Sequence, residues 1–165
     1  MSDRADFDDF FRADFPLLVG FLRKQGHDRA TAEDAAQEAM TKALSSWDGI
    51  THRKAWVRKA GLRIANEHRR RQEREDWTPQ EDPAAAANGS AGYEERELIV
   101  QALSRLPSRQ REVLAWYIDG YSTEEIAALL STRVSTVRSN LRHARKRLDH
   151  LHAQLRETEG GDHDD

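Results

Sequence analysis

The sequence contains no cysteine, which excludes disulfide scaffolds, thiol chemistry and cysteine-ligated zinc or iron–sulfur sites. It also lacks any apolar run near the length of about 18 residues that a membrane-spanning helix needs. The first residues do not show the basic-then-apolar order of a secretory signal. These absences predict a soluble, cytoplasmic protein, and a length of 165 residues fits one compact domain or two very small ones.

The sequence as a whole also has no excess of basic over acidic residues. The net charge is −3, which as a total counts against a nucleic-acid-binding protein. The distribution changes this conclusion, because residues 51–74 carry a net +7 and residues 133–148 a net +6. Acidic stretches of −6 and −5 follow them at residues 75–98 and 149–165. One basic block alone is typical of a solvated helix face, but two such blocks on two helices favour two phosphate-binding surfaces.

The pattern of apolar residues predicts an all-α fold of two small helical domains joined by a flexible linker, because no segment alternates with period two. We expect the first domain at residues 1–72 and the second at residues 94–156. The acidic segment between them, residues 73–93, holds two prolines and two glycines and no apolar period. The acidic tail, residues 157–165, is expected to be disordered.

Three apolar stripes with steps of three and four define the helices of the first domain. Pro16 interrupts the first stripe, so a break or kink is expected there. Thr31 and Asp34 resemble a capping pair before the second stripe. The stripes are Phe7, Phe10, Phe11, Phe15, Leu18, Phe21 and Leu22; Ala32, Ala35, Ala36, Ala39, Met40, Ala43 and Leu44; and Trp56, Val57, Ala60, Gly61, Ile64, Ala65 and His68.

The second domain has the pattern of a helix-turn-helix. Leu98, Ile99, Ala102, Leu103 and Leu106 form a first helix that Pro107 stops, and Val113, Leu114, Tyr117 and Ile118 form a second that Gly120 ends. Ser122 and Glu125 then form a capping box before a short helix centred on Ala127. A polar turn at residues 131–133 leads into a basic helix from about Ser135, where Val137 must allow close crossing. The simpler alternative is a helical hairpin with a basic surface.

At this point the sequence resembles the sigma-70 family of bacterial RNA polymerase sigma factors, and most of all its small two-domain extracytoplasmic-function (ECF) group. Residues 103–148 resemble the domain that reads the −35 promoter element. Residues 32–39 (AEDAAQEA) resemble the polymerase-binding helix, and residues 56–71 resemble the promoter-melting helix. The chain departs from the family pattern at Arg63 and Glu67, and it has Ser131 and Ser135 where glycines are common. We expect Ser135 to serve as an N-cap.

The resemblance implies roles for three groups of residues. The −35 duplex would contact Arg133, Thr136, Arg138, Ser139, Arg142, His143 and Lys146. The melted −10 strand would contact Trp47, Asp48, Gly49, Ile50, Thr51, Trp56, Lys59, Arg63, Asn66 and Arg70. Core RNA polymerase would contact Asp34, Gln37 and Glu38.

Several of these assignments have simpler alternatives. Lys59, Arg63, Asn66 and Arg70 share one helical face that can follow the phosphates of a single strand, but Trp56 beside them is as compatible with a core position as with base stacking. The loop at residues 47–52 would hold a flipped base, with Gly49 allowing a tight turn, or it is an ordinary surface turn. The acidic helix face that includes Asp34 would be a solvated surface without the family resemblance.

The resemblance implies a sigma factor that is not itself an enzyme. Its partners would be promoter DNA, core RNA polymerase through the β′ clamp coiled coil and the β flap, and an anti-sigma factor as a further candidate. No cofactor or metal is expected, because the seven histidines form no metal-ligand spacing and no glycine-rich phosphate loop is visible. The alternative is a stand-alone helix-turn-helix regulator with a sensor domain, although such a domain has no need for a second basic helix.

Overall fold

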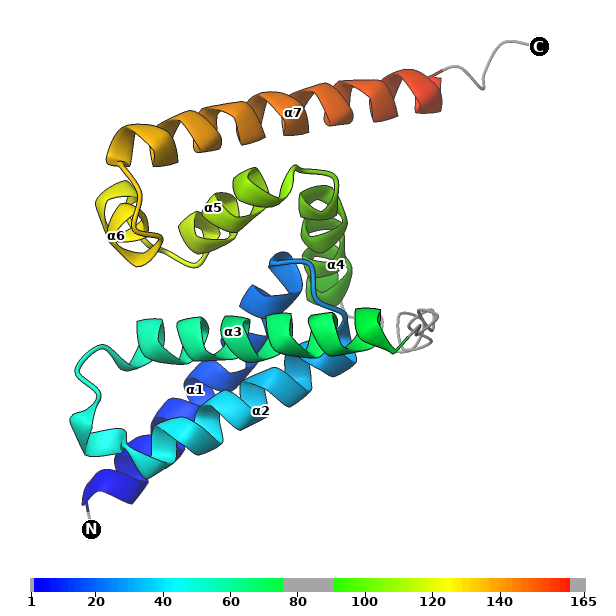
Figure 1. Ribbon diagram of the computed structural model, residues 1–165. Helices are drawn as coiled ribbons and strands as arrows, with labels where there is room; N and C mark the ends of the chain where they lie inside the picture. The colour runs from blue at the N-terminus through cyan, green and yellow to red at the C-terminus, as the bar shows by residue number, and fades with distance from the viewer. Residues whose placement is uncertain (1, 76–90, 161–165) are drawn as a thin grey trace. The chain divides into compact units, whose positions relative to one another are not determined.

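The computed structural model describes residues 2–75 and 91–160, and within these ranges every regular element is a helix. The elements are α1 (Ser2–Lys24), α2 (Arg29–Ser45), the 3-10 helix η1 (Trp47–Gly49), α3 (Arg53–Arg74), α4 (Ala91–Ser104), α5 (Ser108–Ile118), α6 (Thr123–Leu129) and α7 (Val134–Gly160) (Figure 1). They fall into two compact units, residues 1–100 and 101–165. The predicted all-α fold is confirmed. No described helix is both long and apolar enough to cross a membrane.

Helices extend into both segments that were predicted to be irregular. Helix α3 continues to Arg74 and α4 begins at Ala91, so residues 73–74 and 91–93 of the predicted linker are helical. Helix α7 reaches Gly160, so residues 157–160 continue this helix instead of beginning a tail. The rest of the predicted linker, apart from residue 75, and residues 161–165 of the predicted tail lie outside the described residues.

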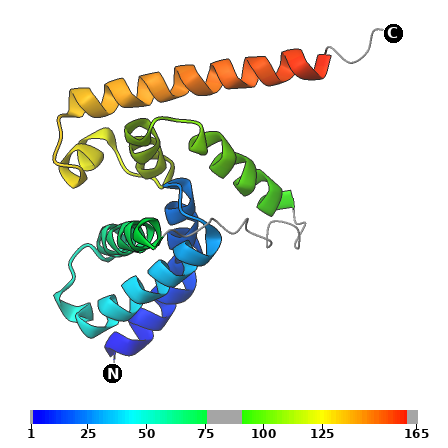
Figure 2. The same cartoon turned by 45° about the vertical axis from the view of Figure 1, so that its right-hand side comes forward.

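Helices α1, α2 and α3 pack side by side in the first unit (Figures 1 and 2). The predicted alanine stripe of α2 is buried, and its short side chains allow the neighbouring backbones to approach closely. Gly61 of α3 shows how close the approach is. A Cβ at this position would lie 3.4 Å from Leu22 Cδ1, 3.5 Å from Leu18 Cδ1 and 3.7 Å from Ala39 Cβ. Leu44, which was assigned to the same stripe, is 45% exposed instead, although its neighbour Ala43 is fully buried.

Pro16 does not break α1. The helix runs as one element from Ser2 to Lys24, and Pro16 lies inside it. Proline removes one backbone hydrogen bond, but buried residues on both sides hold α1 against its neighbours. These residues are Phe7 before Pro16 and Leu18, Phe21 and Leu22 after it. Of the predicted break or kink, the break is therefore wrong, since packing outweighs the lost hydrogen bond.

The predicted cap of α2 is wrong as well. The N-cap is Asp28, whose extended backbone (φ −66°, ψ 165°) precedes the helix. Its carboxylate accepts hydrogen bonds from the backbone N–H of Thr31 at 2.8 Å and from the Thr31 hydroxyl at 3.1 Å. Thr31 is thus the third helical residue. The helix starts earlier than the apolar stripe indicated, because Asp28 is the first residue able to cap it.

A buried ion pair that was not predicted crosses the first unit. Arg58 of α3 is fully buried, and its two terminal nitrogens donate to the two carboxylate oxygens of Asp14 in α1 at 2.6 and 3.0 Å. Asp14 is 5% exposed. This bidentate geometry satisfies both groups, so one residue of the basic block at 51–74 belongs to the core and not to a nucleic-acid surface.

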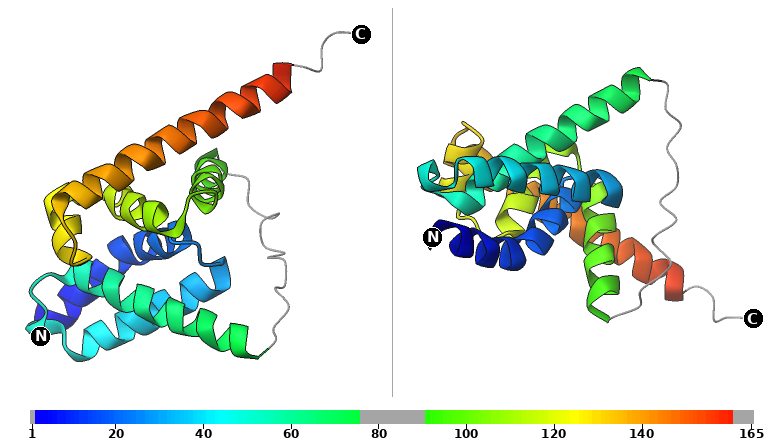
Figure 3. Two further views of the ribbon diagram at one scale, coloured as in Figure 1. Left: turned by 45° about the horizontal axis from the view of Figure 1, so that its top comes forward. Right: turned by 90° about the horizontal axis from the view of Figure 1, so that it is seen from below.

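In the second unit, α7 packs along α5 and α6 (Figure 3). The predicted capping box is confirmed, because Ser122 Oγ accepts from Glu125 N at 3.1 Å and Glu125 Oε1 accepts from Ser122 N at 3.2 Å. Ala127 and Val137 are buried at the crossing, as expected. Trp116, which was not assigned to the core, is 1% exposed and belongs to the same core.

The turn of the helix-turn-helix closes without a glycine. Thr132 N donates to Ala127 O and Ser131 N to Ala128 O, the pair of bonds of a Schellman motif. Ser131 adopts the left-handed backbone conformation with φ 50°, which is energetically unfavourable for any residue that has a Cβ. Helix α7 then begins at Val134, so Ser135 lies inside the helix and the predicted N-cap at Ser135 is wrong.

Candidate nucleic-acid interface

Helix α7 presents a basic outer face in the second unit. Val137, Leu141 and Ala144 point inward and are at most 5% exposed. The predicted −35 residues lie on the other side of α7 or in the turn before it, and all seven are exposed or half-exposed. They are Arg133, Thr136, Arg138, Ser139, Arg142, His143 and Lys146. The structure therefore leaves all seven accessible on α7 or in the turn before it, as an interface with a major groove requires.

The charges on this surface are partly organised by neighbouring helices. Arg138 Nη2 lies 3.2 Å from Glu124 Oε1 of α6, and the Arg145 guanidinium lies 5.6 Å from the centre of the Tyr117 ring of α5. A hydrogen bond from its own backbone N–H, a second from the Thr123 hydroxyl and the nearby Arg138 charge together lower the pKa of Glu124 below its ordinary value of 4.5. Glu124 is therefore a carboxylate at neutral pH.

Two residues of the predicted apolar stripe of α5 are exposed. Tyr117 and Ile118, which were assigned to the stripe of α5, are 41% and 43% exposed. Tyr117 helps to line an open groove of about 390 Å³ together with residues of α6 and α7. Both residues lie in the last turn of α5 beside the buried Ala115 and Trp116, and the Tyr117 ring faces the Arg145 guanidinium instead of the core.

The second basic face belongs to α3 in the first unit. Lys59, Arg63 and Arg70 are exposed and Asn66 is half-exposed, so all four residues of the predicted face are accessible. Trp56 is half-buried, which places it at the edge of this face and not in the core. An aromatic ring beside a basic face is the arrangement that single-strand-binding surfaces use to stack bases.

Not all basic residues of α3 are available to this face. Arg58 is bound to Asp14, and Arg53 pairs with Asp6 of α1 while its guanidinium lies 3.9 Å from the Trp47 ring centre. The +7 counted along the sequence is therefore an upper bound on the charge that a DNA strand would meet.

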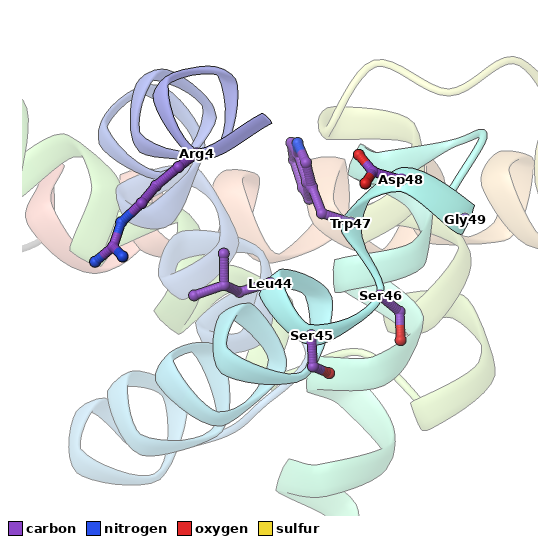
Figure 4. Close-up of a pocket in the computed structure, with 7 residues that line it drawn as sticks. All are labelled: Arg4, Leu44, Ser45, Ser46, Trp47, Asp48 and Gly49. Atoms are coloured by element: carbon purple, nitrogen blue, oxygen red, sulfur yellow. The ribbon is translucent and has the colours of Figure 1, made fainter. Parts of the chain in front are cut away.

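The loop at residues 47–52 divides into a buried and an exposed part. Trp47 is 4% exposed and packs edge-on against Phe7 at 5.1 Å, and Ile50 is 8% exposed. Both are therefore core residues, and only Asp48, Gly49 and Thr51 of the predicted contact residues lie at the surface. Figure 4 shows the Trp47 ring beside an open pocket of about 490 Å³, which Asp48 and Gly49 also line. The sequence pattern did not distinguish the buried residues of this loop from the exposed ones.

The chain turns tightly at Gly49, which ends the 3-10 helix η1 and donates its N–H to Ser46 O at 3.0 Å, but this turn does not require a glycine. The backbone of Gly49 is not in the left-handed region, and a Cβ at this position would meet no atom within 4 Å. The described glycines that do adopt positive φ are Gly26 and Gly120, which end α1 and α5. A substitution at Gly49 would thus cost the fold little.

The three predicted polymerase-binding residues share the outer face of α2. Asp34, Gln37 and Glu38 are all exposed, while the neighbouring alanines at positions 35, 36 and 39 are fully buried. Glu38 forms an ion pair with Lys42 at 3.2 Å and lies 3.8 Å from His68 Nε2 of α3. Among the described residues, no group of three or more His, Asp or Glu could hold a metal ion.

Comparisons with known proteins agree with this architecture. Residues 10–75 match the family Sigma-70 region 2, and residues 96–148 match Sigma-70, region 4. The ECF RNA polymerase sigma factor SigM of Mycobacterium tuberculosis is 31% identical over 154 residues, which cover 91% of this chain and 79% of SigM. The RNA polymerase sigma-E factor of Streptomyces avermitilis is 28% identical over 148 residues, covering 87% and 83%.

Solved structures with the same fold include the sigma factor RpoE from Bartonella quintana in complex with the anti-sigma factor NepR. It has a TM-score of 0.66 and 24% identity, and the alignment covers 88% of this chain and 96% of RpoE. CnrH, in complex with the cytosolic domain of CnrY, has a TM-score of 0.67 and 21% identity, with 92% and 90% covered. The two matched regions, the relatives and the shared fold lead to one conclusion: this chain belongs to the ECF group of the sigma-70 family of RNA polymerase sigma factors.

Proposed function

We propose that this chain directs core RNA polymerase to promoters by binding two DNA elements with two separate faces. The basic face of α7 docks in the major groove of the −35 duplex, where Arg138 and Arg142 are placed to read guanine or to bind phosphates. The basic face of α3 follows the melted −10 strand. The observation that carries this proposal is that each of the two matched sigma regions has its own exposed basic helix face.

The −10 contact is assigned to the exposed residues only. Lys59, Arg63 and Arg70 bind phosphates, Trp56 stacks on an unpaired base, and the surface residues of the 47–52 loop receive the flipped base. Unstacking a base costs a few kcal/mol. Contacts to the captured strand and to polymerase offset this cost, so the chain holds the bubble open without making or breaking a covalent bond.

The polymerase contact is assigned to α2 and to the second unit. Asp34, Gln37 and Glu38 offer two carboxylates and an amide on one exposed face, which suits a basic, polar helix such as the β′ clamp coiled coil. The second unit would contact the β flap. An anti-sigma factor is a further proposed partner, in line with the complexes in which RpoE and CnrH were solved. In this role the chain acts in the cytoplasm.

The proposal is tested by reconstituting the full chain with core RNA polymerase and mapping the transcript starts. We expect promoter-specific transcripts that vanish without the chain. We also expect Arg142→Ala to weaken binding of the reconstituted complex to the −35 duplex by about 1–3 kcal/mol if Arg142 reads a base. Arg156→Ala is the matched control, because it removes an exposed arginine from the same helix outside the helix-turn-helix. Tight duplex binding by the chain alone, with no transcript on any bound sequence, would instead favour the stand-alone regulator.

A further inference from the structure

A buried histidine in the turn between α1 and α2 contacts the DNA-facing helix. His27 follows Gly26, whose positive φ of 94° ends α1, and it is 4% exposed. Two side chains of α3, one turn apart, meet its imidazole. Asn66 Oδ1 lies 3.0 Å from Nε2, and Arg69 Nη2 lies 3.2 Å from Nδ1. Arg69 Nη2 also donates to the Gly26 carbonyl oxygen at 2.8 Å, which fixes the guanidinium in the turn.

The chemistry of these partners determines the protonation of the ring. A guanidinium has only N–H donors, so the Nδ1 atom that it meets must be the acceptor nitrogen of a neutral imidazole. The proton therefore sits on Nε2, which donates to Asn66. The partner atom on Asn66 must then be its carbonyl oxygen, since the amide nitrogen cannot accept. Arg69 thus determines the tautomer of His27, and this tautomer determines the orientation of the Asn66 carboxamide.

These hydrogen bonds use only the carbonyl oxygen of the Asn66 side chain. Asn66 is half-exposed, and its Nδ2 has no hydrogen-bond partner among the described residues. It lies on the face that Lys59, Arg63 and Arg70 share. We propose that His27 is a positioning residue that holds Asn66 with its two N–H donors toward the melted −10 strand, where they meet an acceptor atom of the DNA. This inference rests on the proposed function, and it assigns Arg69 to the turn and not to DNA.

The protonation state is tested directly on the full chain. Nitrogen-15 NMR of the histidine side chains distinguishes a protonated ring nitrogen from a bare one. We expect His27 to show a protonated Nε2 and a bare Nδ1 at neutral pH, and Arg69→Met to convert this into a mixture of the two tautomers. A protonated Nδ1 in the unmodified chain would overturn the inference.

The effect on DNA is tested by a double-mutant cycle in the holoenzyme. The probe is a forked duplex built from the sequence at a mapped transcript start, and binding is read by fluorescence anisotropy. We expect Asn66→Ala to weaken binding about fivefold to tenfold, the effect of one or two lost hydrogen bonds. His27→Ala should weaken it similarly when Asn66 is present and not at all when it is combined with Asn66→Ala. A purely structural His27 would weaken binding in both cases, which would overturn the inference.

Lys59→Ala supplies the matched cycle, because Lys59 shares the face of Asn66. Its effect should add to that of His27→Ala. If His27→Ala fails to fold, Arg69→Met replaces it in the cycle with the same expected coupling to Asn66. If Asn66→Ala has no effect while Lys59→Ala weakens binding, the inference fails and the proposed function stands; if neither substitution matters, the −10 role of α3 fails. A loss confined to one base sequence identifies a base acceptor, and an equal loss for all sequences identifies a phosphate.

Discussion

Removing the buried arginine of α3 should destabilise the first unit selectively. Arg58→Met keeps most of the side-chain length but leaves the carboxylate of Asp14, 5% exposed, without the two N–H donors at 2.6 and 3.0 Å. Breaking a buried ion pair from one side costs about 3–5 kcal/mol, because an uncompensated charge stays in a dry site. A small domain has only about 5–15 kcal/mol of total stability, so a large part of it would be lost.

The assay must separate the two units, since a single melting curve would mix them. Urea unfolding followed by hydrogen exchange and mass spectrometry reports the free energy of unfolding for peptides of α3 and of α7 separately. We expect the loss in α3 with α7 unchanged. Arg63→Met is the matched control on the same helix and, as an exposed position, should change stability by no more than about 0.5 kcal/mol.

The double variant Asp14→Leu with Arg58→Met distinguishes the ion pair from simple packing. Replacing both charges by apolar groups removes the unpaired carboxylate, so most of the lost stability should return. Two results would refute the reasoning. One is an Arg58→Met cost no larger than that of Arg63→Met, and the other is a double variant as unstable as the single one.

Two further predictions concern the second unit. Glu124→Gln should strengthen binding to the −35 duplex by up to about fivefold, because it releases Arg138 from an exposed ion pair and removes a charge that repels phosphate. Glu125→Gln is its control, since it removes a carboxylate but keeps the capping box, and equal gains from both would contradict the role of the pair. Ser131→Gly should stabilise the unit by about 1 kcal/mol in urea unfolding, because φ is 50° there, whereas Ser135→Gly inside α7 should destabilise it by a similar amount. Destabilisation by Ser131→Gly would show that the turn does not carry the strain.

Local signals in the sequence predicted the elements where a short stretch decides the structure. The capping box at Ser122 and Glu125 and the stop at Gly120 need only neighbouring residues, and both are present. The predictions failed where a distant segment competes with the local preference. Pro16 remains inside α1 because α2 and α3 hold the helix on both sides of it. Leu44 continues the apolar period of α2 and is nevertheless exposed, because the neighbouring helices cover Ala43 and not Leu44.

The candidate site shows the same division. The helical period was enough to place Lys59, Arg63, Asn66 and Arg70 on one face of α3. It could not show that Arg58, a basic residue in the same block, is fully buried, because the reason is a carboxylate 44 positions away in the sequence. It also could not separate Trp47 from Asp48, since the burial of Trp47 depends on aromatic residues of α1.

By itself, the sequence determined the helical periods, the capping box, the two basic blocks and the order of motifs that identifies the family. These properties depend on residues a few positions apart, and a helix makes such residues neighbours whatever surrounds it. Only the tertiary structure decided which charges are paired inside the protein. Arg58 is paired in the core and Arg69 is held in a turn by His27 and Gly26, because groups from different helices meet there. In the proposed function, the charge available to DNA is what remains after these internal contacts are made.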